Sequence, residues 1–182
     1  MHQEIIISGF GGQGTLFAGQ LLAYAAMESG HHVTWFPSYG PEMRGGTANC
    51  TVIIGDDPIG APLVTRPDVA VVFNQPSYDK YEPIVKAGGL LVVNRSIVSE
   101  TTDRDDIDAV YVQANAIAEE FGTTKMLNMV LVGAMLRRRP VLEVADVAKS
   151  LTEHLPASKA HLIEANLKVL QRGYDVAVPL AT

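Results

Sequence analysis

The sequence predicts an α/β fold: a single domain over residues 1–182, with a doubly wound, mostly parallel, Rossmann-like sheet and helices on both of its faces. Three observations lead to this expectation. Strand-like and helix-like segments alternate along the chain, several strand-like runs are apolar almost throughout, and the first run ends in a glycine-rich turn that opens into a helix-like segment. Alternating elements favour a parallel sheet, and near-continuous apolar strands are typical of a sheet covered on both faces.

Six strand-like runs are expected, and their composition separates two kinds. Residues 5–7, 69–73 and 90–93 are apolar without interruption, as in strands buried on both faces. Residues 47–54 instead alternate polar side chains with Ala48, Cys50 and Val52, which is typical of a strand with one polar face. We therefore expect residues 47–54 to form an edge or antiparallel strand. The six expected strands are residues 4–8, 33–36, 47–54, 69–73, 90–93 and 110–112.

The helices follow from apolar spacing of three and four residues. The last of them places Ala160, Ile163, Leu167 and Leu170 on one stripe. No internal repeat, low-complexity segment or linker divides the chain, so one domain is expected. The six expected helices are residues 15–29, 78–86, 114–121, 125–138, 142–151 and 158–172.

The turn after the first strand is the most informative segment of the chain. Gly9, Gly11 and Gly14 fit the G-x-G-x-x-G spacing of dinucleotide-binding turns, in the strand–turn–helix context that this pattern requires. Glycines let the backbone approach a ligand closely, and the following helix presents unpaired N–H groups and the positive end of its dipole. We expect Gly9, Gly11, Gly12, Gln13 and Gly14 to bind a phosphate or another anion.

The second half of the dinucleotide pattern is missing. A unit that binds NAD places an acidic residue about 20 positions further on, at the end of the second strand, to hold the ribose. Here Glu28 precedes the second strand and Glu42 follows a loop with a proline, so neither is well placed. The sequence leaves three interpretations of the turn: an anion site, an NAD site, and a turn whose glycines only permit close helix–sheet packing.

Composition excludes several functional classes. The net charge of −6 gives no electrostatic basis for nucleic-acid binding. Cys50 is the single cysteine, so a disulfide within the chain and a cluster or zinc site built from cysteines are excluded. The longest apolar runs are too short for a membrane span, and no signal peptide is evident, so we expect a cytoplasmic protein. An apolar fraction of 47 % suggests that part of the surface is covered by a partner.

In sheets of this kind ligands bind beyond the carboxyl ends of the strands. Residues 9–14, 37–46, 74–77 and 94–96 should gather there. In the longest of these loops Tyr39 offers an aromatic face, Arg44 a guanidinium fork, and Gly45 and Gly46 unhindered backbone, which together could hold a base or a phosphate. Internal pairing of Glu42 with Arg44 is the alternative. Asn74 is a further binding candidate, although with Ser77 it could simply cap the next helix.

At this point the sequence resembles a known family. The segments Gly9-Phe10-Gly11-Gly12-Gln13-Gly14 and Ser38-Tyr39-Gly40-Pro41-Glu42-Met43-Arg44-Gly45-Gly46 resemble the gamma subunit of 2-oxoacid:ferredoxin oxidoreductases, most closely the 2-oxoglutarate type. Ile59-Gly60-Ala61-Pro62-Leu63-Val64, Pro67-Asp68, Asn74-Gln75-Pro76 and Asn128-Met129-Val130-Leu131-Val132-Gly133-Ala134 extend the similarity over about 130 residues.

The resemblance implies a share in an assembly. Such complexes decarboxylate a 2-oxoacid on thiamine diphosphate, pass electrons through iron–sulfur clusters to ferredoxin, and form an acyl-CoA. It implies that alpha, beta and in some cases ferredoxin-like delta subunits hold the thiamine diphosphate, magnesium and clusters, while the gamma chain contacts coenzyme A. By the same analogy Gly11, Gly12, Gln13 and Gly14 would meet the phosphates, and Tyr39, Arg44, Gly45 and Gly46 would line the same cleft.

No catalytic or metal-binding residue is expected in this chain. Its histidines have no serine or cysteine in a nucleophile turn nearby, and no helix carries two histidines at metal spacing. The isolated chain should therefore be inactive. Three alternatives stay open: a pyruvate- or indolepyruvate-type subunit of the same family, a stand-alone dinucleotide-binding oxidoreductase, and a purely structural scaffold.

Overall fold

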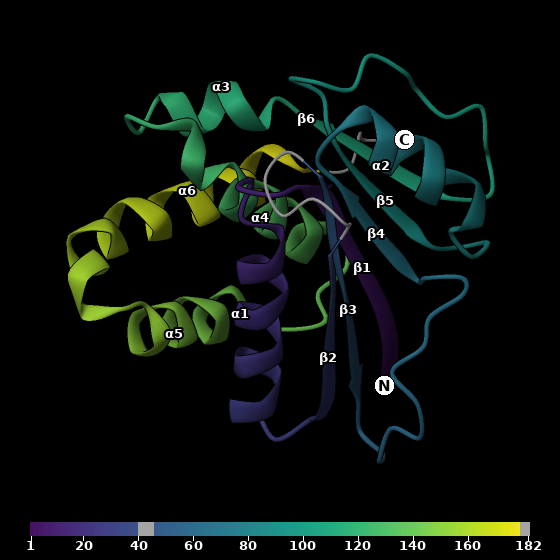
Figure 1. Cartoon of the computed structure of the whole chain (residues 1–182), viewed down its shortest axis with the longest axis horizontal. Helices are drawn as coiled ribbons and strands as arrows, with labels where there is room; N and C mark the ends of the chain where they lie inside the picture. The colour runs from purple at the N-terminus through teal and green to yellow at the C-terminus, as the bar shows by residue number, and fades with distance from the viewer. Residues whose placement is uncertain (40–45, 179–182) are drawn as a thin grey trace.

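A six-stranded sheet runs through the centre of the computed structural model, which describes residues 1–39 and 46–178 (Figure 1). The strand order is β2-β3-β1-β4-β5-β6. Strands β1, β4, β5 and β6 are parallel neighbours, whereas β3 pairs antiparallel with β1 on one side and with β2 on the other. The strands are β1 (His2–Phe10), β2 (His32–Tyr39), β3 (Thr47–Gly55), β4 (Val69–Val72), β5 (Leu90–Asn94) and β6 (Asp108–Val112).

The expected mostly parallel α/β sheet is confirmed, and so is the antiparallel interpretation of residues 47–54. The edge interpretation is wrong, because β3 lies inside the sheet and β2 and β6 form its edges. The polar alternation of β3 has another cause. The strand residues in the cluster around α2 (Gln75–Tyr81) come from β1, β4, β5 and β6, so within the described chain one face of β3 has no helix over it.

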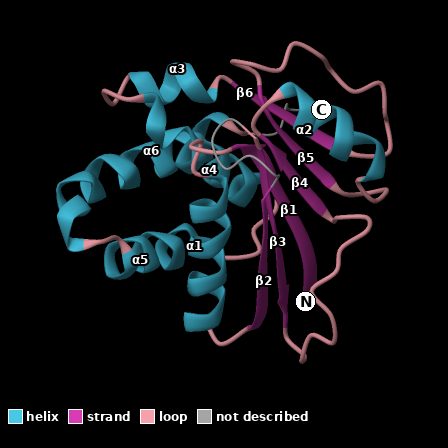
Figure 2. Ribbon diagram, viewed as in Figure 1, coloured by secondary structure: helices cyan, strands magenta, loops and turns pink. Residues whose placement is uncertain are grey.

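Helices cover both faces of the sheet, but unequally (Figure 2). One face packs against α2 in a small core around Ile6, Val72 and Leu91. The other face carries a much larger core, in which β1 and β4 residues such as Ile5, Ile7 and Val71 pack under the remaining helices. Those helices are α1 (Thr15–Glu28), α3 (Ala114–Glu119), α4 (Leu127–Arg138), α5 (Val144–His154) and α6 (Ile163–Val176).

The expected helix 78–86 begins earlier and is shorter. It starts at Gln75 and ends at Tyr81, and a 3₁₀ turn, η1 (Glu82–Ile84), follows. Pro83 accounts for this end, because proline lacks the N–H that would continue the α-helical ladder. Two further 3₁₀ turns, η2 (Thr124–Met126) and η3 (Ala157–Leu162), lead directly into α4 and α6.

Helix α4 is buried from Leu127 to Leu136 and forms the centre of the larger layer. It meets α6 at two glycines. A Cβ at Gly133 would lie 2.1 Å from the Leu170 carbonyl oxygen, and one at Gly173 would lie 2.0 Å from the Val130 carbonyl oxygen. The two backbones are therefore in direct contact, which fixes α6 and the η3 turn before it relative to α4. Within the described ranges, no helix combines the length and apolarity needed to cross a lipid bilayer.

Candidate functional site

The glycine turn between β1 and α1 is held in shape by its own residues. The Gln13 side-chain oxygen accepts a hydrogen bond from the Phe10 N–H at 2.7 Å and another from the Asn74 side-chain amide at 3.4 Å. The Gly11 N–H donates to the Gly46 carbonyl at 3.0 Å, so the end of the long loop lies beside the turn. The Gln13 side-chain amide thus holds the turn in shape from within, and Gly12 lies exposed at the tip of the turn.

Gly12 and Gly14 require glycine for different reasons. Gly12 has a φ of +94°, and no heavy atom of the described residues lies within 4 Å of the position where a Cβ would stand, so none of them fills the space above it. Gly14 is the N-cap of α1 with a φ of +78°, and a Cβ there would come within 2.6 Å of the Asn128 amide nitrogen. Both backbones are in the left-handed region, which other residues seldom adopt.

Two helices begin side by side at this turn. The Asn128 side-chain amide, on the first turn of α4, donates to the Gly14 carbonyl at 3.2 Å. Neither α1 nor α4 has a side-chain cap at its N-terminus, and neither has an acidic residue in its first turn. The first N–H groups of a helix lack partners within the helix, and they carry the positive end of its dipole. In α4 two of these groups are already bonded, because the Leu127 N–H donates to the Thr124 carbonyl oxygen and the Met129 N–H donates to the Asn128 side-chain oxygen. The two N-termini therefore create a region that favours an anion.

A cleft of about 540 Å³ opens from this region. The glycine turn and α1 form one side of the cleft. The η2 turn and the start of α4 form the second side, and the segment from the end of α5 to α6 forms the third. Its volume lies in the ordinary range for a small-molecule site. The cleft is lined by Gly12, Gly14, Phe17, Thr123, Lys125, Met126, Asn128, Leu155, Pro156, Lys159, Leu162 and Asn166.

The charge of the cleft is opposite to that of the whole chain. Two lysines, Lys125 and Lys159, line it, and none of its described lining residues is acidic. Two other lysines are neutralised by carboxylates: Lys86 binds Glu4, and Lys168 binds Glu164. Lys125 and Lys159 pair with no carboxylate in the described part of the chain. In a chain of net charge −6, this separation leaves a positive cleft suited to a phosphate-bearing ligand.

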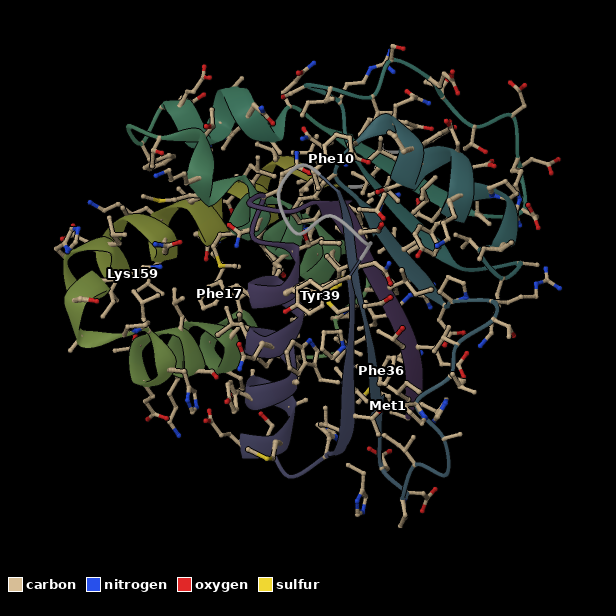
Figure 3. The ribbon with its side chains drawn as sticks, in the orientation of Figure 1. Met1, Phe10, Phe17, Phe36, Tyr39 and Lys159 are labelled. Carbon is tan, nitrogen blue, oxygen red and sulfur yellow. The ribbon has the colours of Figure 1, made fainter. Side chains whose placement is uncertain are left out.

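Figure 3 shows where the labelled side chains of this region lie. Phe17 projects from α1 and Lys159 from η3, on two different walls of the cleft. Tyr39 lies at the end of β2 and is 57 % exposed. Its ring is available to a ligand or a partner, although Tyr39 is not among the residues that line the cleft.

The ten residues that the sequence nominates fall into three groups. Gly12 and Gly14 line the cleft. A second group shapes or borders the turn without lining the cleft: Gly9 is buried, Asn74 caps α2 through the Ser77 N–H, Tyr39 ends β2, and the others brace the turn. The second group is Gly9, Gly11, Gln13, Tyr39, Gly46 and Asn74. Arg44 and Gly45 lie outside the described residues.

Sequence reasoning missed the cationic part of the site. Lys125 follows no motif, and Lys159 belongs to a 3₁₀ turn between two helices far from the glycine turn in sequence. Only the fold brings these segments together, because the α4–α6 contact places η3 opposite α1. One residue of the sequence pointed to this side of the site. Asn128 begins the segment 128–134, which resembles the gamma subunit, and its side chain contacts Gly14.

Cys50 takes no part in the site. It is fully buried beneath α1, where its thiol points to the Thr15 carbonyl oxygen at 3.6 Å. Burial raises the pKa of the Cys50 thiol to about 12, so the reactive thiolate is absent at neutral pH. The single cysteine is therefore structural.

Comparison with known proteins places the chain in a family. Residues 4–176 match the family described as pyruvate ferredoxin/flavodoxin oxidoreductase. The chain belongs to this family. It is 34 % identical over 184 residues to the 2-oxoglutarate synthase subunit KorC of Methanocaldococcus jannaschii, with 99 % of this chain and 96 % of the relative covered. It is 37 % identical over 174 residues to the ketoisovalerate oxidoreductase subunit VorA of Methanothermobacter marburgensis, covering 96 % of this chain but only 36 % of that relative.

Solved structures agree with this assignment. The gamma subunit of a keto/oxoacid ferredoxin oxidoreductase from Geobacter sulfurreducens superposes with a TM-score of 0.81 at 30 % identity, covering 96 % of this chain and 98 % of the other. A 2-oxoglutarate:ferredoxin oxidoreductase from Magnetococcus marinus, with 2-oxoglutarate, coenzyme A and succinyl-CoA bound, has a TM-score of 0.88 at 22 % identity. There the match covers 97 % of this chain and 31 % of the larger one, and it establishes the shared fold.

Proposed function

We propose that this chain is the gamma subunit of a CoA-acylating 2-oxoacid:ferredoxin oxidoreductase and that its cleft receives the phosphate-bearing part of coenzyme A. The observation that carries the proposal is the positive cleft at the glycine turn, where two helix N-termini meet Lys125 and Lys159 without any described acidic neighbour. Support comes from gamma-type relatives matched along almost their whole length and from a structural neighbour that binds coenzyme A.

The residues fit the phosphates of coenzyme A. The open backbone at Gly12 and the unpaired N–H groups of α1 suit a diphosphate, which they would bind as they bind other anions at helix N-termini. The two ammonium groups offer charge to further phosphate oxygens, and Phe17 and Leu162 give apolar walls for the rest of the ligand. Gly9, Gly11, Gln13, Gly46 and Asn74 would act indirectly, by holding the turn open.

The chemistry of the reaction belongs to partner subunits in this proposal. Thiamine diphosphate, magnesium and iron–sulfur clusters would be held by alpha and beta chains and, where one is present, a delta chain, with ferredoxin as the electron acceptor. Cys50 is the single cysteine of these 182 residues, and a cluster needs several thiolates. The chain also exposes apolar side chains of the kind that partners cover: Phe36 on edge strand β2 is 51 % exposed and Leu63 is 75 % exposed.

The cleft is tested in the complex reconstituted with its alpha and beta partners. Charge-assisted hydrogen bonds contribute about 1.5–3 kcal/mol each. Replacing both lysines (Lys125→Ala with Lys159→Ala) should therefore raise the KM for coenzyme A at least about tenfold, with kcat at saturating coenzyme A nearly unchanged, because binding common to ground and transition states is lost. An unchanged KM would contradict the proposed cleft.

Lys149→Ala is the matched control for this measurement. Lys149 is exposed on α5 and does not line the cleft, so its removal should leave the KM for coenzyme A at the wild-type value. A rise equal to that of the double variant would mean that net charge, rather than the cleft, sets the affinity.

The oxoacid is proposed to be 2-oxoglutarate or a related 2-oxoacid, since a relative of matching length is a 2-oxoglutarate synthase subunit. The reconstituted complex should reduce ferredoxin fastest with 2-oxoglutarate in a panel that also contains pyruvate, 2-ketoisovalerate and indolepyruvate. The chain alone should turn over none of them. Turnover by the isolated chain would contradict its assignment as a non-catalytic subunit.

A further inference from the structure

A second cluster of chemically active side chains lies at the opposite end of α1. Glu28 ends α1, and Glu153 and His154 end α5. One potential ligand atom from each of these three residues lies within 4.8 Å of the others. The imidazole Nε2 of His154 faces the Glu28 carboxylate, with which it forms a hydrogen bond. Three metal-ligating groups from two helices therefore converge on one point.

The electrostatics of this point favour a cation. Both contributing helices end here, so the negative ends of two dipoles meet two carboxylates. Helix α1 has no basic residue in its last turn, and the only basic residue in the last turn of α5 is His154 itself. Within the described chain, Glu28 forms its ion pair with His154 alone, and Glu153 forms none. Negative charge at this site exceeds what one imidazole can balance.

The position of the imidazole is fixed by packing. Tyr24 lies one turn before Glu28 on α1, and its ring stacks on His154 with a centroid separation of 4.0 Å and an interplanar angle of 8°. The stack leaves the ring edge, with Nε2, directed at Glu28. The ligand nitrogen is thus held in place, and the two carboxylates, on exposed side chains, need only rotate to share an ion with it.

We propose that Glu28, Glu153 and His154 form a binding site for a divalent transition-metal ion of the Zn²⁺ type. One imidazole nitrogen and two carboxylate oxygens are a ligand set that Zn²⁺ accepts, whereas Mg²⁺ and Ca²⁺ prefer oxygen alone. The three protein ligands leave at least one coordination position for water or for a group from a partner. This site is separate from the cleft and does not depend on the proposed function.

The ion would join the ends of α1 and α5. His154 is followed directly by Leu155 and Pro156, which line the cleft. A cation at the cluster would therefore restrain the segment from which η3 and Lys159 project. We expect metal binding to raise the stability of the chain, because a ligand that binds only the folded state stabilises it by mass action.

The test is a Zn²⁺ titration of the tag-free full chain, followed by calorimetry and by the visible spectrum of added Co²⁺. The wild type should bind one Zn²⁺ and show a higher Tm in its presence. His154→Ala and Glu28→Gln should each weaken binding at least about tenfold and abolish the Tm rise. Glu153→Gln should weaken binding as well, and each variant's Tm without metal shows that it is folded.

His161→Ala is the matched control, since His161 is exposed on η3 and lies outside the cluster. It should bind Zn²⁺ as the wild type does. Absence of stoichiometric Zn²⁺ binding, or binding that survives in both His154→Ala and Glu28→Gln, would overturn the site and leave Glu28 and His154 as an ion pair only. Equal displacement of Zn²⁺ by Mg²⁺ at the same concentration would likewise overturn the assignment to an ion with nitrogen affinity.

Discussion

The two ends of α1 differ in a way that an ordinary surface helix would avoid. Most helices place acidic residues in the first turn and basic residues in the last, which neutralises their dipole. Helix α1 has neither. Its N-terminus instead meets Lys125 and Lys159 in a cleft without described acidic residues, and its C-terminus meets Glu153 beside Glu28. The surroundings therefore add to the dipole charge at each end rather than neutralise it. The positive N-terminus suits an anion, and the negative C-terminus suits a cation.

The largest expected effect is at the N-terminal end. Gly14→Ala should lower the free energy of unfolding by about 2–3 kcal/mol, because the left-handed backbone costs about 1–2 kcal/mol and Asn128 must give up its hydrogen bond. Gly12→Ala shares the positive φ but has open space, so it should cost only about 1–2 kcal/mol. Urea unfolding of the two variants measures the difference. Equal losses would show that the Asn128 contact does not secure this end.

The middle of α1 packs closely against the sheet, whereas its two ends are accessible to ligands. A Cβ at Gly19 would lie 2.3 Å from the Cys50 sulfur, so helix and strand are in close contact there. Because the pKa of Cys50 rises from 9.0 to about 12 on folding, the unfolded thiol ionises first as the pH rises above 9. Stability should then fall with pH, by up to about 1.4 kcal/mol per pH unit.

Cys50→Ala provides the reference for that measurement. Denaturant unfolding of both proteins at pH 8 and pH 10 should show a steeper loss for the wild type, and native Cys50 should resist thiol reagents at pH 8. Parallel pH curves and rapid modification of the native thiol would show that the middle of the helix is as accessible as its ends.

Salt should affect the positive end of α1 through the two lysines. Raising ionic strength from low to physiological values screens partly exposed charges. The affinity of the wild-type complex for coenzyme A should fall roughly threefold, whereas the variant without Lys125 and Lys159 should change less. Parallel salt dependence in the two proteins would assign the screening to charges outside the cleft.

The smallest expected effect concerns the negative end. Met27 is 56 % exposed in the last turn of α1, so Met27→Lys adds a cation there with little loss of packing. The substitution should raise the free energy of unfolding by about 0.3–1 kcal/mol at low salt. Met27→Gln is the uncharged control, and thermal unfolding of the pair isolates the charge. A lysine variant no more stable than the glutamine variant would contradict the claim that the negative charge at the C-terminal end of α1 is not neutralised.

The sequence predicted the fold well because apolar runs report local burial directly. The runs predicted at 69–73 and 90–93 correspond to the buried strands Val69–Val72 and Leu90–Asn94, and the glycine spacing correctly located the β1–α1 turn. The position of β3 could not be predicted, since its polar alternation reflects which face lacks a helix, and that depends on where α2 packs. Strand order is a property of the whole sheet rather than of one segment.

The site was predicted only in part, for a related reason. Glycine spacing indicates a turn because glycine adopts backbone conformations that other residues seldom reach. Gly12 and Gly14 could therefore be predicted as site residues from local sequence. Lys125 and Lys159 have no local pattern, and they join the turn only because Gly133 and Gly173 let α4 and α6 touch. The cluster of Glu28 with His154 joins residues 126 positions apart, which no motif would connect.

The insertion of β3 between β1 and β2 has a consequence for cofactor choice. Gly9 and Tyr39 are both paired with Ala48, so they stand in register two strands apart, about 9.6 Å at the usual spacing. An acidic side chain grafted at the end of β2 would be too short to reach a ribose seated over the glycines. Converting this scaffold to nicotinamide chemistry would thus demand a rearranged sheet, and no single substitution could supply it.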